Sequence, residues 1–231
     1  MNKRLIRMIK DLAGPTFYSN KSYSQEGEDL VINRLTQGKQ NGFYIEIGCH
    51  HPFRFSNTYF LYRNGWKGIC IDPLPGTKKL FNKWRPRDIT LEMGISETAS
   101  TLEYYMFNEP ALNTFNADLA HERNKLNEYK IIDVKKIATN TLETILENLK
   151  ITKEIDLFSI DVEGFDLEVL KSNNWSKFKP KIIIVECLTA DLLHLQNDEI
   201  CKFLQMQGYQ PYAKTGYSVI FTQQETQQYH A

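Results

Sequence analysis

Short apolar runs alternate with segments of helical periodicity along most of this chain. The runs are nearly continuous, as expected of parallel strands that are buried on both faces, and they cover 43–47, 66–72, 89–95, 155–161 and 180–187. The segments between them predict helices at 28–35, from Ser56 to Gly65, and at 78–84, 141–149, 167–170 and 198–207. We expect Ser56 or Asn57 to cap the second of these. This alternation predicts an α/β fold with a doubly wound, mostly parallel sheet.

Two further strands, 209–213 and 217–221, are separated by a short turn and should pair antiparallel at the end of the sheet. Residues 104–107 favour another short strand, whereas 108–130 lack clear periodicity. An irregular segment of that length in a compact domain is more often a lid or a substrate loop than a plain connection. We therefore expect one domain over 23–231 that carries an insertion at 96–130.

Residues 1–12 have the pattern of a short amphipathic helix, with Leu5, Ile9 and Leu12 on one face. Together with the irregular connection that follows, this helix makes up an N-terminal segment at 1–22. It has a basic start but no unbroken apolar core, so we do not interpret it as a secretory signal. Packing on its own domain or on a second subunit of a homo-oligomer is the favoured interpretation. Docking on a membrane surface is the weaker alternative, because so short a helix binds lipid poorly.

The composition of the 231 residues excludes several classes of protein. Apolar residues make up 42% and charged residues 24%, a globular profile. Lys plus Arg and Asp plus Glu number 28 each, so no net charge attracts nucleic acid. No apolar run approaches the roughly 20 residues of a transmembrane helix. The four cysteines lack metal-binding spacing and predict buried reduced thiols in a cytoplasmic protein.

Acidic residues recur where the predicted strands end. Asp72, Asp161 and Glu186 each close a strand, and Glu46 lies just inside the end of the first. The carboxyl ends of parallel strands share one edge of the sheet, where ligands bind. Four acids gathered there would repel one another unless they bound hydroxyl groups, a cation or a positively charged ligand. Taken singly, each is explained equally well as a helix cap or a solvated turn residue.

The turn after the first strand limits the choice of cofactor. Only Gly48 stands there, with His50 and His51 where a dinucleotide-binding fold would have further glycines. S-adenosylmethionine suits the turn better, because it carries no phosphate and its sulfonium and ammonium groups are compatible with acids. Asp72 follows Gly48 by 24 residues, close to the spacing of about 20 at which an acid reaches ribose hydroxyls.

The chain resembles the FkbM-type S-adenosylmethionine-dependent methyltransferases. The matching pieces occur in order from residue 22 to 190 and read YSQEGED (23–29), GFYIEIG (42–48) with His51-Pro52, SNTY (56–59), GWKGICIDP (65–73) and SIDVEG (159–164). Glu46 departs from the frequent Asp, and Cys49 from the usual Ala. The resemblance implies a class I methyltransferase fold, Rossmann-like, with a seven-stranded, mostly parallel sheet, helices on both faces and a final antiparallel strand. It also implies O-methylation, commonly of sugars in polysaccharides, glycolipids or secondary metabolites.

The resemblance also implies roles for particular residues. Glu46 and Gly48 would frame the methionine part of the cofactor, Asp72 would hold the ribose, and the turn that contains Ser96 would face the adenine. The residues that would reach the methionine end or the acceptor are Gln25, Glu28, Ser56 and Asn57. Capping of two helices explains these last four equally well.

Transfer of a methyl group to a hydroxyl needs an aligned acceptor and a group that takes the proton. The candidate bases are His50, His51, Asp161 and Glu163. Alternatively Asp161, Glu163 and Glu186 could hold Mg²⁺ or Mn²⁺, which would lower the pKa of the acceptor hydroxyl. Aromatic residues near the strand ends, such as Tyr104 and Phe115, are compatible with stacking on sugar rings but equally with a plain core.

We therefore expect an S-adenosylmethionine-dependent O-methyltransferase that acts on a sugar hydroxyl, in a nucleotide-sugar or a surface glycan. The expected partners are a small-molecule or glycan acceptor and no nucleic acid. A binding module that kept the cofactor fold without turnover is one alternative. An NAD-dependent oxidoreductase is another, disfavoured by the missing glycines.

Overall fold

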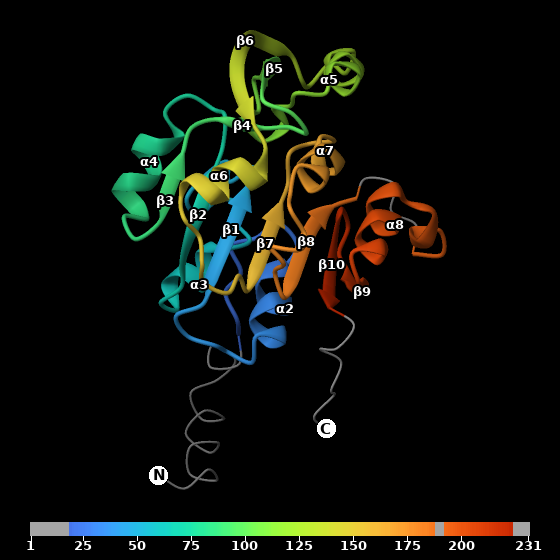
Figure 1. Cartoon of the computed structure of the whole chain (residues 1–231). Helices are drawn as coiled ribbons and strands as arrows, with labels where there is room; N and C mark the ends of the chain where they lie inside the picture. Colours follow the sequence, from blue (N-terminus) through green and yellow to red (C-terminus); the bar gives the residue numbers. More distant parts are fainter. Residues whose placement is uncertain (1–18, 188–191, 224–231) are drawn as a thin grey trace, which may run out of the picture.

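The computed structural model describes residues 19–187 and 192–223. They form a central seven-stranded sheet with helices on both faces and a smaller three-stranded sheet at one edge (Figure 1). The strands of the central sheet, in spatial order, are β3 (Ile89–Leu91), β2 (Lys67–Ile71), β1 (Phe43–Ile47), β7 (Leu157–Ile160), β8 (Ile182–Glu186), β10 (Ser218–Gln223) and β9 (Tyr209–Lys214). The predicted helix at 1–12 lies outside the described residues.

The pairing directions confirm the predicted fold class. β3, β2, β1, β7 and β8 pair in parallel, whereas β10 runs antiparallel to both β8 and β9. The order of the strands reverses at β1, since β2 and β3 lie on one side of it and β7 and β8 on the other. Such a switch point is where ligands bind in open α/β sheets, outside the carboxyl ends of the strands.

Each face of the central sheet is covered by its own set of helices. One face packs α6 (Leu142–Asn148), α7 (Asp166–Lys171) and α8 (Glu199–Met206). The other packs α2 (Glu28–Leu35), α3 (Tyr59–Arg63) and α4 (Thr77–Trp84). Fully buried side chains fill both layers, for example Ile45 and Phe158 on the first face and Tyr44 and Trp66 on the second. Both faces are therefore apolar, which accounts for the continuous apolar runs in the sequence.

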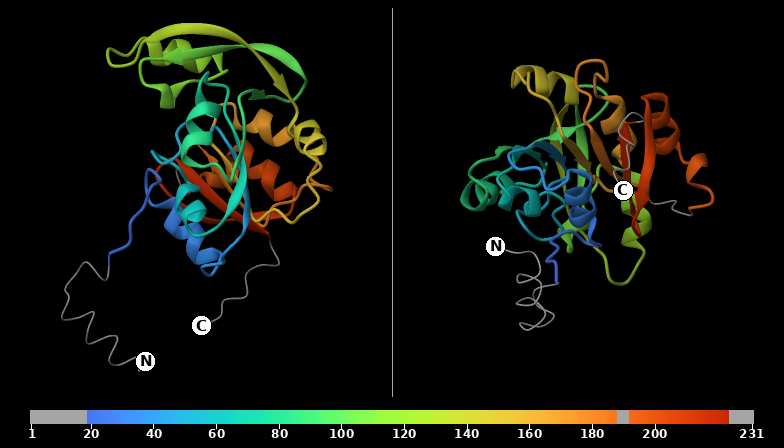
Figure 2. Two further views of the ribbon diagram at one scale, coloured as in Figure 1. Left: turned by 90° about the vertical axis from the view of Figure 1, so that its left-hand side faces the viewer. Right: turned by 90° about the horizontal axis from the view of Figure 1, so that it is seen from below.

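The insertion folds as a separate layer over the carboxyl edge, by which we mean the edge where β1, β2, β7 and β8 end (Figures 1 and 2). The layer extends beyond the predicted bounds of 96–130, because its strands are β4 (Gly94–Ile95), β6 (Ile131–Asn140) and β5 (Ser100–Phe107), in that order. Between β5 and β6 come a 3₁₀ turn, η2 (Pro110–Leu112), and α5 (Ala117–Asn124); a second 3₁₀ turn, η3 (Leu195–Asn197), precedes α8. The insertion is thus an ordered cover above the switch point.

Three details differ from the expectations. The run 89–95 is two strands, because β3 stays in the central sheet while β4 pairs with β6 in the small one. The long strand β6 was not predicted, since most of its side chains are exposed or only partly buried and leave no apolar run. Helix α3 begins at Tyr59 rather than near Ser56, whose Oγ still accepts the Tyr59 N–H at 3.1 Å.

Candidate functional site

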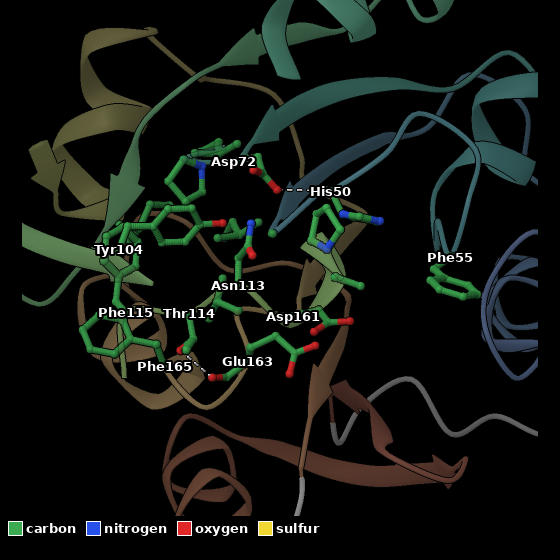
Figure 3. Close-up of a pocket in the computed structure, with 18 of the residues that line it drawn as sticks. His50, Phe55, Asp72, Tyr104, Asn113, Thr114, Phe115, Asp161, Glu163 and Phe165 are labelled. Carbon is green, nitrogen blue, oxygen red and sulfur yellow. Dashed lines mark hydrogen bonds between the residues drawn. The ribbon is translucent and has the colours of Figure 1, made fainter. Parts of the chain in front are cut away.

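A pocket of about 740 Å³, counting the part open to solvent, lies between the carboxyl edge and the insertion (Figure 3). Gly48, Asp72 and Asp161 line it from the ends of β1, β2 and β7. The insertion closes the other side with Tyr104, Asn113, Thr114 and Phe115. We call this space the cofactor pocket.

Gly48 is required by the close approach of β1 to β7. Its φ is +78°, and a Cβ built there would lie 1.7 Å from the backbone oxygen of Asp161. No other residue could occupy this turn without separating the ends of the two strands. The backbone of Gly48 therefore forms part of the pocket wall, as a bound cofactor needs at the switch point.

Asp72 is buried at the end of β2 and joins the two loops beside it. Its carboxylate accepts the His50 N–H at 2.7 Å and the Leu74 N–H at 2.8 Å. Burial nevertheless raises the pKa of this carboxyl to about 6, with these two hydrogen bonds acting in the opposite direction. At neutral pH Asp72 is thus an ionised hydrogen-bond acceptor at the pocket wall.

Three carboxyl groups meet beside the pocket, and we call Asp161, Glu163 and Glu186 the carboxylate cluster. One oxygen from each lies within 4.8 Å of the others. Among the described residues, the buried Oε2 of Glu186 has no hydrogen-bond partner. Within the described part of the chain, Glu163 is the one member of the cluster with an ion pair, to Arg123 from α5 at 2.5 Å. Burial, followed by mutual repulsion, raises the pKa of Asp161 and of Glu186. The cluster thus has an excess of negative charge that a cation or a proton must offset.

The turn that carries the cluster is held from both layers. The Asp166 carboxylate accepts the N–H groups of Val162 and Gly164 at 3.2 and 3.1 Å. From the insertion, Thr114 Oγ1 donates to the Glu163 carbonyl at 2.8 Å and Asn116 Nδ2 to the Gly164 carbonyl at 3.1 Å. The insertion therefore fixes the position of the acids as well as covering them.

Backbone strain is concentrated at the pocket. Six non-glycine residues of the described chain have a positive φ, and half of them (His50, Phe55 and Glu163) line the cofactor pocket. A left-handed backbone is costly for such residues and is retained mostly at functional sites. This distribution supports the pocket as the site of binding.

The two candidate histidines lie in different surroundings. His50 lines the cofactor pocket, and burial followed by the nearby Arg54 lowers its pKa to about 4. His51 does not line the pocket, and its Nδ1 accepts the backbone N–H of Arg54 at 3.2 Å within the same loop. Its lowered pKa makes His50 a weak base. His51 instead holds the shape of the loop through its hydrogen bond with the Arg54 N–H.

Glu46 does not reach the carboxyl edge, which corrects the expectation of four acids at one edge. Its side chain points into the layer between the sheet and helices α2, α3 and α4. There Thr58 Oγ1 donates a hydrogen bond to it at 2.6 Å and Arg85 pairs with it at 3.2 Å. Arg85 is fully buried and also pairs with Asp88 at 2.7 Å. Side chains alternate between the faces of a strand, so Glu46 shares the face of Tyr44 rather than the face next to the pocket.

The remaining predicted cofactor residues divide into two groups. Gln25 lines the cofactor pocket and, with Glu28 and Asn57, a smaller pocket that reaches Asp161 and Glu186. Ser56 bonds with Glu46 and Arg85 instead, away from both pockets. Ser96 likewise lies outside the lining: its Oγ contacts Thr139 Oγ1 at 2.6 Å and fastens β4 to β6.

Several lining residues were not singled out from the sequence. Met93 and Phe165 line the pocket, as do Asn113 and Thr114 of the insertion. Asn113 and Thr114 give a weak signal in the sequence, because the segment 108–130 lacks clear periodicity and its contacts with the central domain are all long-range. The aromatic residues Tyr104 and Phe115 do meet, with ring centroids 4.8 Å apart, and both face the pocket.

Comparison with known proteins identifies the family. The model of the methyltransferase FkbM domain matches residues 46–211. The chain belongs to the FkbM methyltransferase family. Members use S-adenosylmethionine as the methyl donor, so the chain is a methyltransferase that uses this cofactor. Among curated proteins no sequence matches significantly.

Solved methyltransferases are similar to this FkbM family member at low sequence identity. One is a methyltransferase from Geobacter sulfurreducens with 10% identity and a TM-score of 0.47, covering 96% of this chain and 90% of that one. Another is a precorrin-6y C5,15-methyltransferase from Geobacter metallireducens with 13% identity, a TM-score of 0.44 and coverage of 88% and 92%. Neither likeness bears on the acceptor. No helix among the described residues is long and apolar enough to cross a membrane.

Proposed function

We propose that this FkbM-family methyltransferase transfers the methyl group to a sugar hydroxyl, with Asp161 as the general base. The carrying observation is that Asp161 lines both the cofactor pocket and the smaller pocket of Gln25, Glu28 and Asn57. A base at the junction of donor and acceptor sites can reach a hydroxyl aligned with the methyl carbon.

The proposed reaction is an in-line displacement. The bound cofactor supplies a methyl group already activated by its sulfonium. The acceptor oxygen forms a bond to that carbon, the sulfur keeps the electron pair of the broken bond, and the hydroxyl proton passes to Asp161. Gly48 and Asp72 position the donor, and the acceptor hydroxyl is aligned beside Asp161. Burial, followed by repulsion from Glu163, raises the pKa of Asp161, which makes its ionised form a stronger base than an exposed carboxylate.

An alternative to Asp161 as the base is a divalent cation held in the carboxylate cluster. Three carboxyl oxygens within 4.8 Å of one another are ligands that Mg²⁺ or Mn²⁺ prefers. The unpartnered Oε2 of Glu186 and the raised pKa of the cluster support a cation there. Its chemistry would be to lower the pKa of the acceptor hydroxyl, which leaves Asp161 as ligand rather than base.

The test separates chemistry from binding. Asp161→Asn should retain affinity for S-adenosylhomocysteine but lose methyl transfer by roughly 100-fold or more, the usual range for a general base. Turnover is measured as S-adenosylhomocysteine release over a panel of neutral glycosides, sugar phosphates and nucleotide-sugars, with and without Mn²⁺. Full turnover by Asp161→Asn would exclude it as base. Wild-type protein that binds the cofactor but methylates none of the panel would favour the binding module.

A further inference from the structure

We propose that the acceptor carries a phosphate group, which binds in a basic groove beside the cofactor pocket. The proposal rests on the sugar methylation proposed above and names the chemical class of that sugar. The groove is lined by the loops after β1 and β2 and by α4: His50, His51, Arg54, Leu74, Pro75, Gly76, Thr77, Lys79, Leu80, Lys83 and Pro110. Counted like the cofactor pocket, its volume is about 1090 Å³.

The groove adjoins the cofactor pocket. His50 and Pro110 line both spaces, so a ligand in the groove lies next to a ligand in the pocket. At the junction, Arg54 Nη1 lies 3.1 Å from His50 Nε2 and both guanidinium arms pair with Glu109 at 3.0 Å. Arg54 and Glu109 thereby tie the loop after β1 to the insertion across the entrance.

The charges of the two spaces are opposite. The cofactor pocket contains Asp72, Asp161 and Glu163, whereas no carboxylate lines the groove. The basic residues of the groove are Lys79, Lys83 and Arg54, of which Arg54 is already paired with Glu109. Lys79 and Lys83 are four residues apart on α4 and so lie on one face of the helix. Neither has an ion pair within the described part of the chain. Although the whole chain has equal numbers of acidic and basic residues, the two kinds lie in separate spaces at the binding site.

This separation assigns the two spaces to different ligands. The sulfonium and ammonium of the cofactor are repelled by the lysines and attracted by the acids. An anionic acceptor prefers the reverse, and lysines are frequent partners of phosphate as point charges. Leu74, Pro75 and Leu80 supply an apolar surface that strengthens such pairing by lowering the local dielectric constant.

Exposed aromatic side chains border the basic groove. The Lys83 Nζ lies 5.2 Å from the ring of Trp84, and that ring meets Phe53 edge-on at 5.7 Å. Both rings are substantially exposed, Trp84 by 49% and Phe53 by 37%. A sugar ring or a base attached to the phosphate could stack on them. A sugar phosphate and a nucleoside-diphosphate sugar therefore share the chemistry that the groove would recognise.

The test uses the full chain saturated with S-adenosylhomocysteine, titrated by calorimetry with glucose 1-phosphate, uridine diphosphate, glucuronate and neutral methyl glucoside. We expect the phosphate compounds to bind and the double variant Lys79→Gln/Lys83→Gln to weaken their binding about tenfold. The control Lys67→Gln/Lys78→Gln removes the same charge from exposed positions outside the groove and should bind like the wild type. Tighter binding of uridine diphosphate points to a nucleotide-sugar, and equal binding to a phosphorylated glycan.

Three results would overturn the proposal: no phosphate compound binds, glucuronate binds equally well, or the lysine variant binds like the wild type. These results are distinguishable from failure of the proposed function. If the enzyme methylates neutral glycosides and Lys79→Gln/Lys83→Gln does not change that activity, the proposal of a phosphate on the acceptor is refuted while the methyltransferase function stands. Absence of S-adenosylhomocysteine binding by the folded chain removes the function itself.

Discussion

The carboxylate cluster predicts an unusual response to the loss of a charge. Replacement Glu186→Gln keeps the shape of the side chain and removes one of three neighbouring carboxylates. Two ionised groups 4.8 Å apart repel by about 3.5 kcal/mol at an effective dielectric constant of about 20. The new amide can also donate a hydrogen bond to a remaining carboxylate. We therefore expect the variant to be more stable than the wild type in the absence of divalent cations.

The gain should depend on pH with a definite sign. Burial and repulsion raise the pKa of Glu186 in the folded protein, whereas an unfolded Glu titrates near about 4.3. The stability that protonation supplies is complete below that value and is lost as the pH rises toward the folded pKa. Glu186→Gln should consequently raise Tm by roughly 5–10 °C at about pH 8, if it recovers most of the 3.5 kcal/mol, and by little at about pH 5.

The assay is thermal unfolding followed by circular dichroism in the presence of a chelator. Glu97→Gln is the control, because Glu97 is an exposed acid outside the cluster and its loss should change Tm little at either pH. In a second series, Mn²⁺ should raise the Tm of the wild type more than that of Glu186→Gln. A Glu186→Gln variant no more stable than the wild type at about pH 8, or equally stabilised at about pH 5, would refute the reasoning.

Three further outcomes follow from the site and its supports. Gly48→Ala should abolish cofactor binding, measured by calorimetry, because its Cβ would collide with the Asp161 carbonyl; unchanged affinity would contradict the packing of β1 on β7. Asp72→Asn should weaken S-adenosylmethionine binding roughly 10- to 100-fold, and wild-type affinity should fall as the pH drops through about 6, where Asp72 gains its proton. A flat pH profile would remove the ribose assignment. Arg85→Met should destabilise the fold by about 3–5 kcal/mol in urea unfolding, since it leaves the buried acid Glu46 without its cation; a loss below about 1 kcal/mol would contradict the buried pairing.

The carboxylate cluster could be predicted because its geometry follows from the sheet. Asp161 and Glu186 end strands β7 and β8, which are adjacent and parallel, so their carboxyl ends must lie side by side. Glu163 follows Asp161 by two residues and stays within reach. The positions of the acids at the strand ends, together with the rule that parallel strands end at one edge of the sheet, were therefore enough to predict the cluster.

Glu46 shows where such reasoning fails. Its position near a strand end predicted that it lines the pocket, but its side chain pairs with Arg85, a partner 39 residues away that no local pattern reveals. The prediction missed strand β6 for a different reason, because a strand that is exposed on much of its surface has no hydrophobic periodicity. The sequence therefore predicted an insertion that acts as a lid or substrate loop, but not the three-stranded sheet and helix α5 that it forms.

The most direct test of the central claim is calorimetric titration of the full chain with S-adenosylmethionine near neutral pH. The cofactor pocket predicts one site per chain, with affinity reduced in Asp72→Asn and abolished in Gly48→Ala. A chain with a normal cooperative thermal transition that releases no heat of binding, and shows no rise in Tm with the cofactor, would contradict the account.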